Sequence, residues 1–403
     1  MGSSKWLYIL ILAISASCSK FDDFDDHDDF HELEPEDLET DLLVLNFDVN
    51  QLEFNNMYYN PTQDIEVDAE LEAYRNGEEI MDDEEVEIEI KGRTTNEASL
   101  KSLGVEFEDH FDNTDRKLLN PKTILPHHNI DEIEAFRLRN SGNDLGKTML
   151  KDLSYSQLAI EAGLDVDAMY GEPVVVFVNE NFLGVLNLRT ETNHDGITHL
   201  VQEDVHEITL VEIFQKGIVI PKKGDLGFIE SYFDAIEEGD LDYVKEHTDL
   251  NSFIDYVFFE SFVANRDWPF NNARLYTFNE EKFRFIMFDF DFCNTMHLDK
   301  EPWHFIHPQD PDHIDNPITK LFDLLYTDSE FKANYEQRYD ELLNSGLFTA
   351  SRFNAIVDEN AKRIEELMDI QIQKHKLPAS KAEWYLELEV LKDHYEKRLR
   401  HFE

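Results

Sequence analysis

The sequence predicts an α+β fold with a β-rich N-terminal half and a helical C-terminal half. Period-two alternation of apolar and polar residues fills the first half, and helical periodicity with good helix formers fills the second. The 403 residues, 41% hydrophobic and 12% aromatic, can bury one large core or two modest ones. No linker, repeat or low-complexity block interrupts residues 42–403, so these are expected to form one domain.

The first half contains several segments typical of strands. "IEVDAELEAY" and "EVEIEIKG" alternate apolar with acidic residues, and the turn-prone "RNGEE" joins them. "EAFRLRN" continues the pattern, and "EPVVVFVNENFLGVLNLRT" is expected to form a hairpin that turns at residues 179–181.

The second half contains segments typical of helices. Apolar residues between Asp249 and Ala264 fall on one helical face, and Asp249 is a suitable N-cap. Amphipathic segments rich in helix formers follow at 331–343, 352–373 and 382–400. The histidine-containing stretch Trp303 to His313 is expected to be a loop, because it matches no zinc-binding spacing.

The charge of the chain restricts its partners. The formal net charge is -51, with 87 acidic against 36 basic residues. Nucleic acids and anionic membranes need a positive surface, so binding to either is not expected. Most of the acidic residues are interpreted as a solvated surface, while a specific role in binding cations or a basic protein stays open.

The N-terminus is typical of an exported protein. Lys5, the apolar run "WLYILILAI" and the small residues before Cys18 predict a signal peptide over residues 1–17. The run is shorter than the ~20 residues that span a bilayer. Its end resembles a bacterial lipobox, which predicts a lipid anchor at Cys18. The acidic stretch after Cys18 resembles a surface-export signal of bacterial lipoproteins, which predicts a place at the outer membrane or cell surface. Residues 18–41, in which "SKFDDFDDHDDF" follows Cys18, are predicted to be an extended acidic tether. Only Cys293 would remain in the folded part, so no intramolecular disulfide is expected.

A candidate site begins in "NRDWPFNN", which follows the helix that Asp249 starts. "ARLYTF" and "KFRFIMF" then predict a hairpin, and "FDFDF" with Asp289 and Asp291 follows. A helix, a loop with Asp and Asn, a hairpin and a metal-type Asp occur in this order in protein kinases. In this interpretation Asp267 orients the attacking hydroxyl, and Asn272 and Asp289 place a metal.

Each part of the candidate site also has a structural interpretation. Asp267 alone is compatible with a turn or a helix cap, and "FDFDF" with an edge strand whose acids face water. Two acids buried at the end of an aromatic strand would be costly without a cation, so the combination favours a site.

Several segments of the chain together resemble a known family. "IEIKGRTT", "FRLRNSGNDLGKTMLKDL", "PVVVFVNENFLGVLNLR", "NRDWPFNNARLY" and "FRFIMFDFDF" are similar, in order, to the signature blocks of the CotH kinase family. The resemblance runs from about Ile65 to the C-terminus. It implies an atypical protein-kinase-like fold, and transfer of the ATP γ-phosphate to serine residues of a protein with Mg²⁺ or Mn²⁺. It also implies that Asp267 is catalytic and that Asp289 binds metal, with Asn272 and Asp291 as further ligands.

The residues that would contact the nucleotide are less well defined. The early block reads "KGRTT", with Arg93 where the family usually has Asn. Lys101 is then the candidate to bind phosphates, and a solvated lysine at a strand edge is the alternative. Arg137 and Arg139 alternate with apolar residues and so share one face of a strand. They are candidates for holding phosphate oxygens, and a structural salt bridge is the alternative.

Two function classes remain open from the sequence. One is an extracytoplasmic serine kinase acting on a protein, and the other is a non-catalytic surface adhesin or scaffold. The intact Asp267, Asn272 and Asp289 favour the kinase, whereas the scarcity of ATP outside the inner membrane favours the scaffold. The expected partner is a protein with an accessible serine, with membrane contact only through the anchor and the chain as a monomer.

Overall fold

The computed structural model describes residues 33–38, 40–92, 95–109, 114–115, 118–119, 121–126, 130–202, 208–307 and 316–402. The predicted signal peptide, Cys18 and Arg93 lie outside these residues and stay predictions. Among the helices within these ranges, none combines the length and apolar character that crossing a membrane requires.

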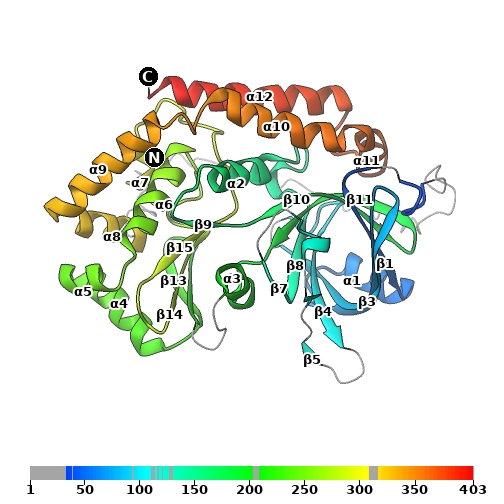
Figure 1. The fold of residues 1–403 in the computed structure, drawn as a ribbon, viewed down its shortest axis with the longest axis horizontal. Helices are drawn as coiled ribbons and strands as arrows, with labels where there is room; N and C mark the ends of the chain where they lie inside the picture. Colours follow the sequence, from blue (N-terminus) through cyan, green and yellow to red (C-terminus); the bar gives the residue numbers. More distant parts are fainter. Residues whose placement is uncertain are drawn as a thin grey trace, which may run out of the picture.

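The first half of the chain forms a closed seven-stranded barrel (Figure 1). Neighbouring strands run in the order β3-β2-β1-β10-β11-β8-β4, and pairing of β3 with β4 closes the ring. β1 and β10 are parallel, and the other neighbours within the ring are antiparallel. The strands are β1 (Leu43–Val49), β2 (Glu66–Arg75), β3 (Glu78–Lys91), β4 (Ser102–Asp109), β8 (Ala135–Arg139), β10 (Gly171–Val178) and β11 (Asn181–Thr190), with the short β5 (Thr114–Asp115) beside β4.

The predicted hairpins of the barrel are confirmed. β2 and β3 alternate between buried apolar and more exposed acidic residues, because one face lines the core and the other meets water. β10 and β11 are almost continuously buried, since one face lines the barrel and helices cover the other. Asn179 and Glu180 join them at φ angles of 49° and 63°, the left-handed pair that two-residue hairpin turns use.

A second, five-stranded sheet lies beside the barrel (Figure 1). Its order is β13-β12-β14-β15-β9, and it contains the hairpin predicted to follow the candidate loop. Its strands are β9 (Asp167–Ala168), β12 (Ile208–Phe214), β13 (Ile218–Lys223), β14 (Ala273–Phe278) and β15 (Arg284–Met287). A small pair, β6 (Leu118–Leu119) and β7 (Glu132–Ile133), is separate from both.

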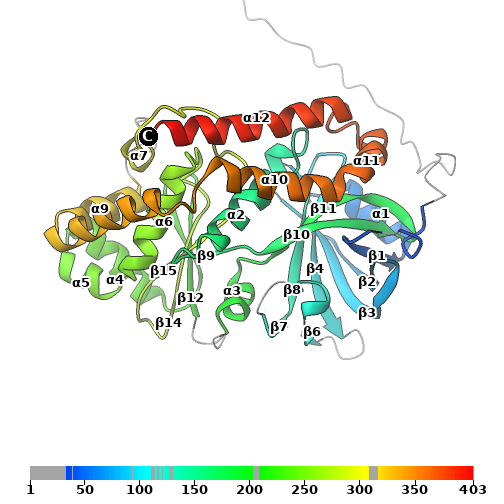
Figure 2. The ribbon, with the colours of Figure 1, turned by 45° about the horizontal axis from the view of Figure 1, so that its top comes forward.

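Helices dominate the second half, as predicted. Among the described residues, the second half contains α4 (Leu226–Glu238), α5 (Leu241–Glu246), α6 (Leu250–Phe262), α7 (Pro302–Ile306), α8 (Pro317–Tyr326), α9 (Ser329–Asn344), α10 (Ala350–Ile364), α11 (Met368–His375) and α12 (Lys381–Arg400). The first half contains α1 (Gln51–Tyr59), α2 (Lys151–Glu161) and α3 (His194–Val201). Figures 1 and 2 show α12 running along both the second sheet and the barrel, with α10 beside it and the shorter α2 between the two parts. One large apolar cluster therefore extends through both parts.

Two helix predictions need correction. The segment 352–373 is not one helix, because a 3₁₀ turn at Glu365–Leu367 separates α10 from α11. The stretch 303–313 is not a loop throughout, because α7 covers Pro302–Ile306 with a proline in its first turn, a position that needs no N–H donor. The Asp249 N-cap of α6 is confirmed, since its side chain accepts from the Ser252 amide.

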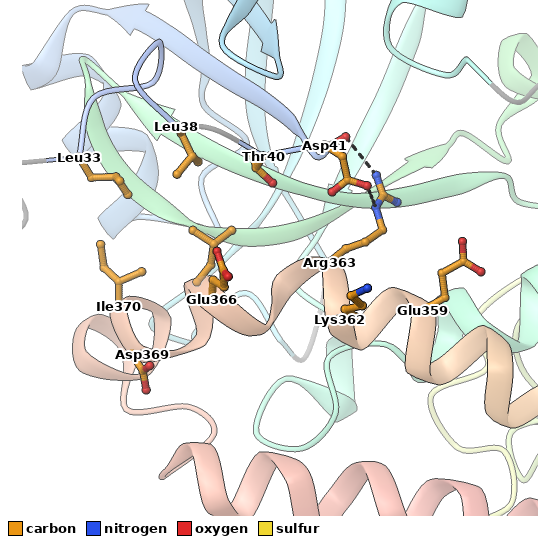
Figure 3. A pocket seen from close by; sticks show the side chains of 11 residues that line it. Leu33, Leu38, Thr40, Asp41, Glu359, Lys362, Arg363, Glu366, Asp369 and Ile370 are labelled. Atoms are coloured by element: carbon orange, nitrogen blue, oxygen red, sulfur yellow. Dashed lines mark hydrogen bonds and ion pairs between the residues drawn. The ribbon is translucent and has the colours of Figure 1, made fainter.

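The structure also differs from the expected tether at its C-terminal end. Leu33 and Leu38 pack against the core, and Arg363 of α10 donates to the Asp41 carboxylate at 3.2 Å (Figure 3). A groove of about 810 Å³ lies between this segment and α10–α11. Its lining is Leu33, Leu38, Thr40, Asp41, Glu359, Lys362, Arg363, Glu366, Leu367, Asp369 and Ile370. Apolar residues within the acidic segment explain why its end docks on the domain.

Candidate functional site

The candidate loop starts where α6 ends. Ala264 has a left-handed φ of 52°, which stops the helix, and the backbone then turns so that the Asn271 amide donates to the Asp267 carbonyl at 3.0 Å. The Asp267 carboxylate is half-buried. Its Oδ2 accepts from the side-chain amides of Asn271 at 3.3 Å and of Asn272 at 3.4 Å.

Asn272 joins the loop to Asp289. Its Nδ2 also donates to Asp289 Oδ2 at 2.7 Å. Asp289 follows β15 with a φ of 64°, a left-handed conformation that Asp tolerates better than most residues, so "FDFDF" leaves the sheet instead of continuing it. The structure therefore brings together Asp267, Asn272 and Asp289, three residues that the sequence selected.

Asp291 lies beneath this group and is only 4% exposed. Its Oδ2 accepts from the Asn143 amide at 3.0 Å, while Oδ1 is buried and has no hydrogen-bond partner among the described residues. Gly142 has a φ of +54°, and a Cβ built on it would lie 1.9 Å from Asp291 Oδ2. Only glycine fits this close approach, so the backbone after β8 forms a cradle for the carboxylate.

Arg139 connects the barrel to these acids. Its Nη2 donates to Asp289 Oδ1 at 2.8 Å and lies 3.5 Å from Asp291 Oδ2. Its Nε is 3.9 Å from Asp152 of α2. The end of β8, the start of α2 and the segment after β15 thus meet in one charged cluster.

Sequence reasoning did not select two members of this cluster. Asp152 Oδ1 accepts from the Phe290 amide at 2.9 Å, and its Oδ2 lies 3.3 Å from Nη1 of Arg189, which is fully buried. The sequence did contain a signal for this pair, namely Arg189 at the end of the apolar strand "VLNLRT". An arginine in a buried strand requires an acidic partner, so an acid near it could have been expected.

The electrostatics of the cluster follow from burial and from its excess of acids. Burial, with repulsion from Asp289, raises the pKa of Asp267, and the Asn271 hydrogen bond opposes the rise. Burial and Asp289 likewise raise the pKa of Asp291 well above its ordinary value, although Arg139 opposes this. The pKa of Asp152 is lowered, because Arg189 and Arg139 together outweigh its burial.

Arg137 and Lys101 lie apart from the acids. Arg137 shares a strand face with Arg139, as predicted, but it forms a two-pronged pair with Glu191 at 3.1 and 2.8 Å. The Lys101 ammonium donates to the carbonyls of Asn96 at 2.5 Å and Ala98 at 2.9 Å, and it is buried. Nucleotide contact by either residue stays a prediction, and these partners favour the structural alternatives.

The oxygen ligands at the site suit a divalent metal whose remaining coordination positions are filled by the phosphates of a nucleotide. Within the described ranges, no three His, Cys, Asp or Glu side chains converge into a metal-binding group. Mg²⁺ needs only one or two carboxylates, because phosphates and waters complete its shell. Asp289, Asp291 and the Asn272 amide oxygen are oxygen ligands of the kind that Mg²⁺ takes, and Asp291 Oδ1 has no hydrogen-bond partner among the residues that the structure describes.

The geometry agrees with a comparison to known families. The sequence model described as "CotH kinase protein" matches residues 88–402. The chain belongs to the CotH kinase family. No curated protein matches the chain. Membership suggests a kinase-like enzyme, for which ATP and a divalent metal are the expected cofactors. The matched range begins within β3, yet β1 and β2 before it complete the barrel.

Proposed function

We propose that this member of the CotH kinase family is an extracytoplasmic protein kinase with an atypical kinase-like fold. It transfers the γ-phosphate of ATP to serine residues of a protein, with Mg²⁺ or Mn²⁺. One observation carries the proposal, namely that the Asn272 amide donates to both Asp267 and Asp289. Through this one nitrogen the two carboxylates lie next to each other, which supports Asp267 as the base and Asp289 as a metal ligand, the two roles that phosphoryl transfer uses.

Asp267 has the environment of a base. Partial burial raises the pKa of its carboxyl, which strengthens it as a proton acceptor while it stays accessible. It accepts the proton of the substrate serine as the serine oxygen bonds to the γ-phosphorus. The bond from that phosphorus to the β–γ bridging oxygen breaks, and ADP leaves. Asn271 and Asn272 fix the carboxylate through its Oδ2, which leaves Oδ1 to face the hydroxyl.

Asp289 and Asp291 would hold the metal, with Asn272 beside them. A bound divalent cation neutralises phosphate charge and aligns the γ-phosphate for attack. Arg139 lies against the same two carboxylates, so it keeps them in place before ligands bind and contributes positive charge next to the phosphates.

One observation favours the alternative, a non-catalytic surface adhesin or scaffold. Arg139 already neutralises Asp289 and Asp291, as a structural salt bridge would, and Asp152 and Arg189 extend the network into the core. In a scaffold the cluster only joins the barrel to the second sheet, and no metal-dependent nucleotide binding is expected.

The two functions separate in a binding and transfer experiment on the purified chain. Calorimetry should detect ATP binding that depends on Mg²⁺ or Mn²⁺. Asp289→Asn should weaken it, and Asn272→Ala should show a milder defect. Asp267→Asn should retain binding and lose about 10²–10⁴-fold in transfer of labelled phosphate to a serine-peptide library. Asp340→Asn, an exposed change on α9, is the matched control. Wild-type protein that binds no nucleotide with either metal would establish the scaffold.

The proposed location and partner come from the sequence. The signal peptide and Cys18 support a lipid anchor at the outer membrane or cell surface, and palmitate labelling lost in Cys18→Ala tests it. The substrate is a protein with an accessible serine, and the acidity of the chain favours a basic one. The chain acts as a monomer, which sedimentation can check.

A further inference from the structure

Glu260 is a buried acid that the proposed reaction does not use. It lies in the last turn of α6 and is 1% exposed. Its Oε2 accepts from the Asn265 side-chain amide at 2.9 Å. The same Asn265, also 1% exposed, accepts through Oδ1 from the Asp267 backbone amide at 3.3 Å. A continuous hydrogen-bonded path therefore runs from the interior of α6 to the backbone of the proposed base.

A second acid on the same helix provides a contrast. Asp255, five residues earlier and equally buried at 1%, is held by Arg338 through bonds of 2.8 and 2.7 Å. No ion pair joins Glu260 to a cation among the described residues, and the charged side chains that act on it electrostatically are the acids Asp289 and Asp267. An ionised Glu260 would thus be buried, unpaired and repelled from the site above it.

The other titratable groups around Glu260 do not compensate its charge. Tyr256 lies one turn earlier on α6, and Cys293 approaches from the segment after Asp291. Neither is cationic. Burial, with the repulsion of Asp289 and Asp267, raises the pKa of Glu260 to about 8, against the opposing Asn265 hydrogen bond.

We propose that Glu260 is a positioning residue of this site, which holds the Asp267 backbone through Asn265 and does so in its neutral, protonated form. The carboxyl keeps Oε2 as the acceptor for Asn265 and carries its proton on Oε1. Its catalytic consequence rests on the proposed kinase function, whereas its protonation state does not.

Protonation can be tested without any activity. Between the ordinary value of 4.5 and about 8, folded Glu260 holds a proton that the unfolded chain has released. Its contribution to stability is therefore full at low pH and is lost as the pH rises through 8. Melting temperatures of wild type should fall between pH 5 and 8 more steeply than those of Glu260→Gln. Asp255→Asn is the control, and it should be less stable at both pH values because it loses an ion pair.

Positioning can be tested by kinetics. Glu260→Ala should lower kcat at least ~10-fold with the KM for ATP within two-fold, because Asp267 shifts while the nucleotide site stays. Glu260→Gln keeps an oxygen acceptor and should restore most of kcat. Asn265→Ala should lose kcat as Glu260→Ala does, but its melting temperature should fall with rising pH at least as steeply as that of wild type, because the Asn265 hydrogen bond opposes the raised pKa of Glu260.

The possible failures are distinguishable. If the melting temperatures of wild type and Glu260→Gln changed equally with pH, Glu260 would not be protonated as proposed. An unchanged kcat in Glu260→Ala would disprove its role in positioning Asp267. Wild-type protein without any phosphotransfer would contradict the kinase function instead, and the melting curves would still decide whether Glu260 carries a proton.

Discussion

Substituting Gly142 by alanine tests whether the position of Asp291 matters. The new Cβ would lie 1.9 Å from Asp291 Oδ2, and contacts under 3.0 Å essentially never occur. The carboxylate must therefore move by at least about 1 Å, which breaks its bond to the Asn143 amide and shifts it from Arg139.

The expected cost has two parts. An alanine at a φ of +54° costs about 1 kcal/mol relative to glycine. The lost hydrogen bond to a buried carboxylate adds about 1–3 kcal/mol. We expect Gly142→Ala to lower the free energy of unfolding by about 2–4 kcal/mol, and the displaced Asp291 carboxylate to weaken metal-dependent ATP binding.

Gly163 offers a matched control. Its φ is +64°, and a Cβ there would meet nothing within 4 Å. Gly163→Ala should carry only the ~1 kcal/mol backbone cost and leave ATP binding unchanged. Denaturant unfolding and calorimetry on both variants provide the two readouts. If Gly142→Ala matches Gly163→Ala in both, Asp291 is not held as described and is not a ligand.

Three further changes test other parts of the structure. Arg398 of α12 is fully buried and donates to the carbonyls of Ser261, Phe262, Leu298 and Lys300. Arg398→Met should therefore lower the free energy of unfolding by about 3–5 kcal/mol, measured with a denaturant, whereas Arg400→Met at an exposed position should change it little. Equal effects of the two substitutions would refute this role of Arg398. Burial lowers the pKa of His375 to about 4. As the pH falls below 6.5, the unfolded chain therefore binds a proton at this histidine before the folded chain does, and up to about 3 kcal/mol of stability should be lost between pH 6.5 and 4. His375→Gln should remove that loss. A wild-type slope retained in the glutamine variant would contradict it. Lys101→Met should lower the free energy of unfolding by about 1–3 kcal/mol, because the carbonyls of Asn96 and Ala98 lose their donor, and ATP affinity should stay within two-fold. A larger loss of ATP affinity with unchanged stability would instead indicate that Lys101 contacts the nucleotide.

The sequence by itself determined the fold class and most local elements. The alternation in β2 and β3, the turn at Asn179 and Glu180, and the Asp249 cap of α6 are all local patterns. Local rules also placed Asp267, Asn272 and Asp289, because their order along one short stretch repeats a known arrangement of loop and hairpin. These features need few distant contacts, so periodicity, caps and spacing specify them.

Only the tertiary structure decided which charges meet. Arg137 and Arg139 look equivalent in the sequence, yet one pairs with Glu191 and the other with Asp289, 150 residues away. The closure of the barrel through β3 and β4, the docking of Leu33, Leu38 and Asp41 and the break between α10 and α11 likewise depend on distant packing. Glu260 shows the physical reason most clearly. Glu260 and Asp255 are both acids within the same helical sequence, and nothing in that sequence distinguishes their environments. Only the fold pairs Asp255 with Arg338 and exposes Glu260 to the repulsion of Asp289 and Asp267.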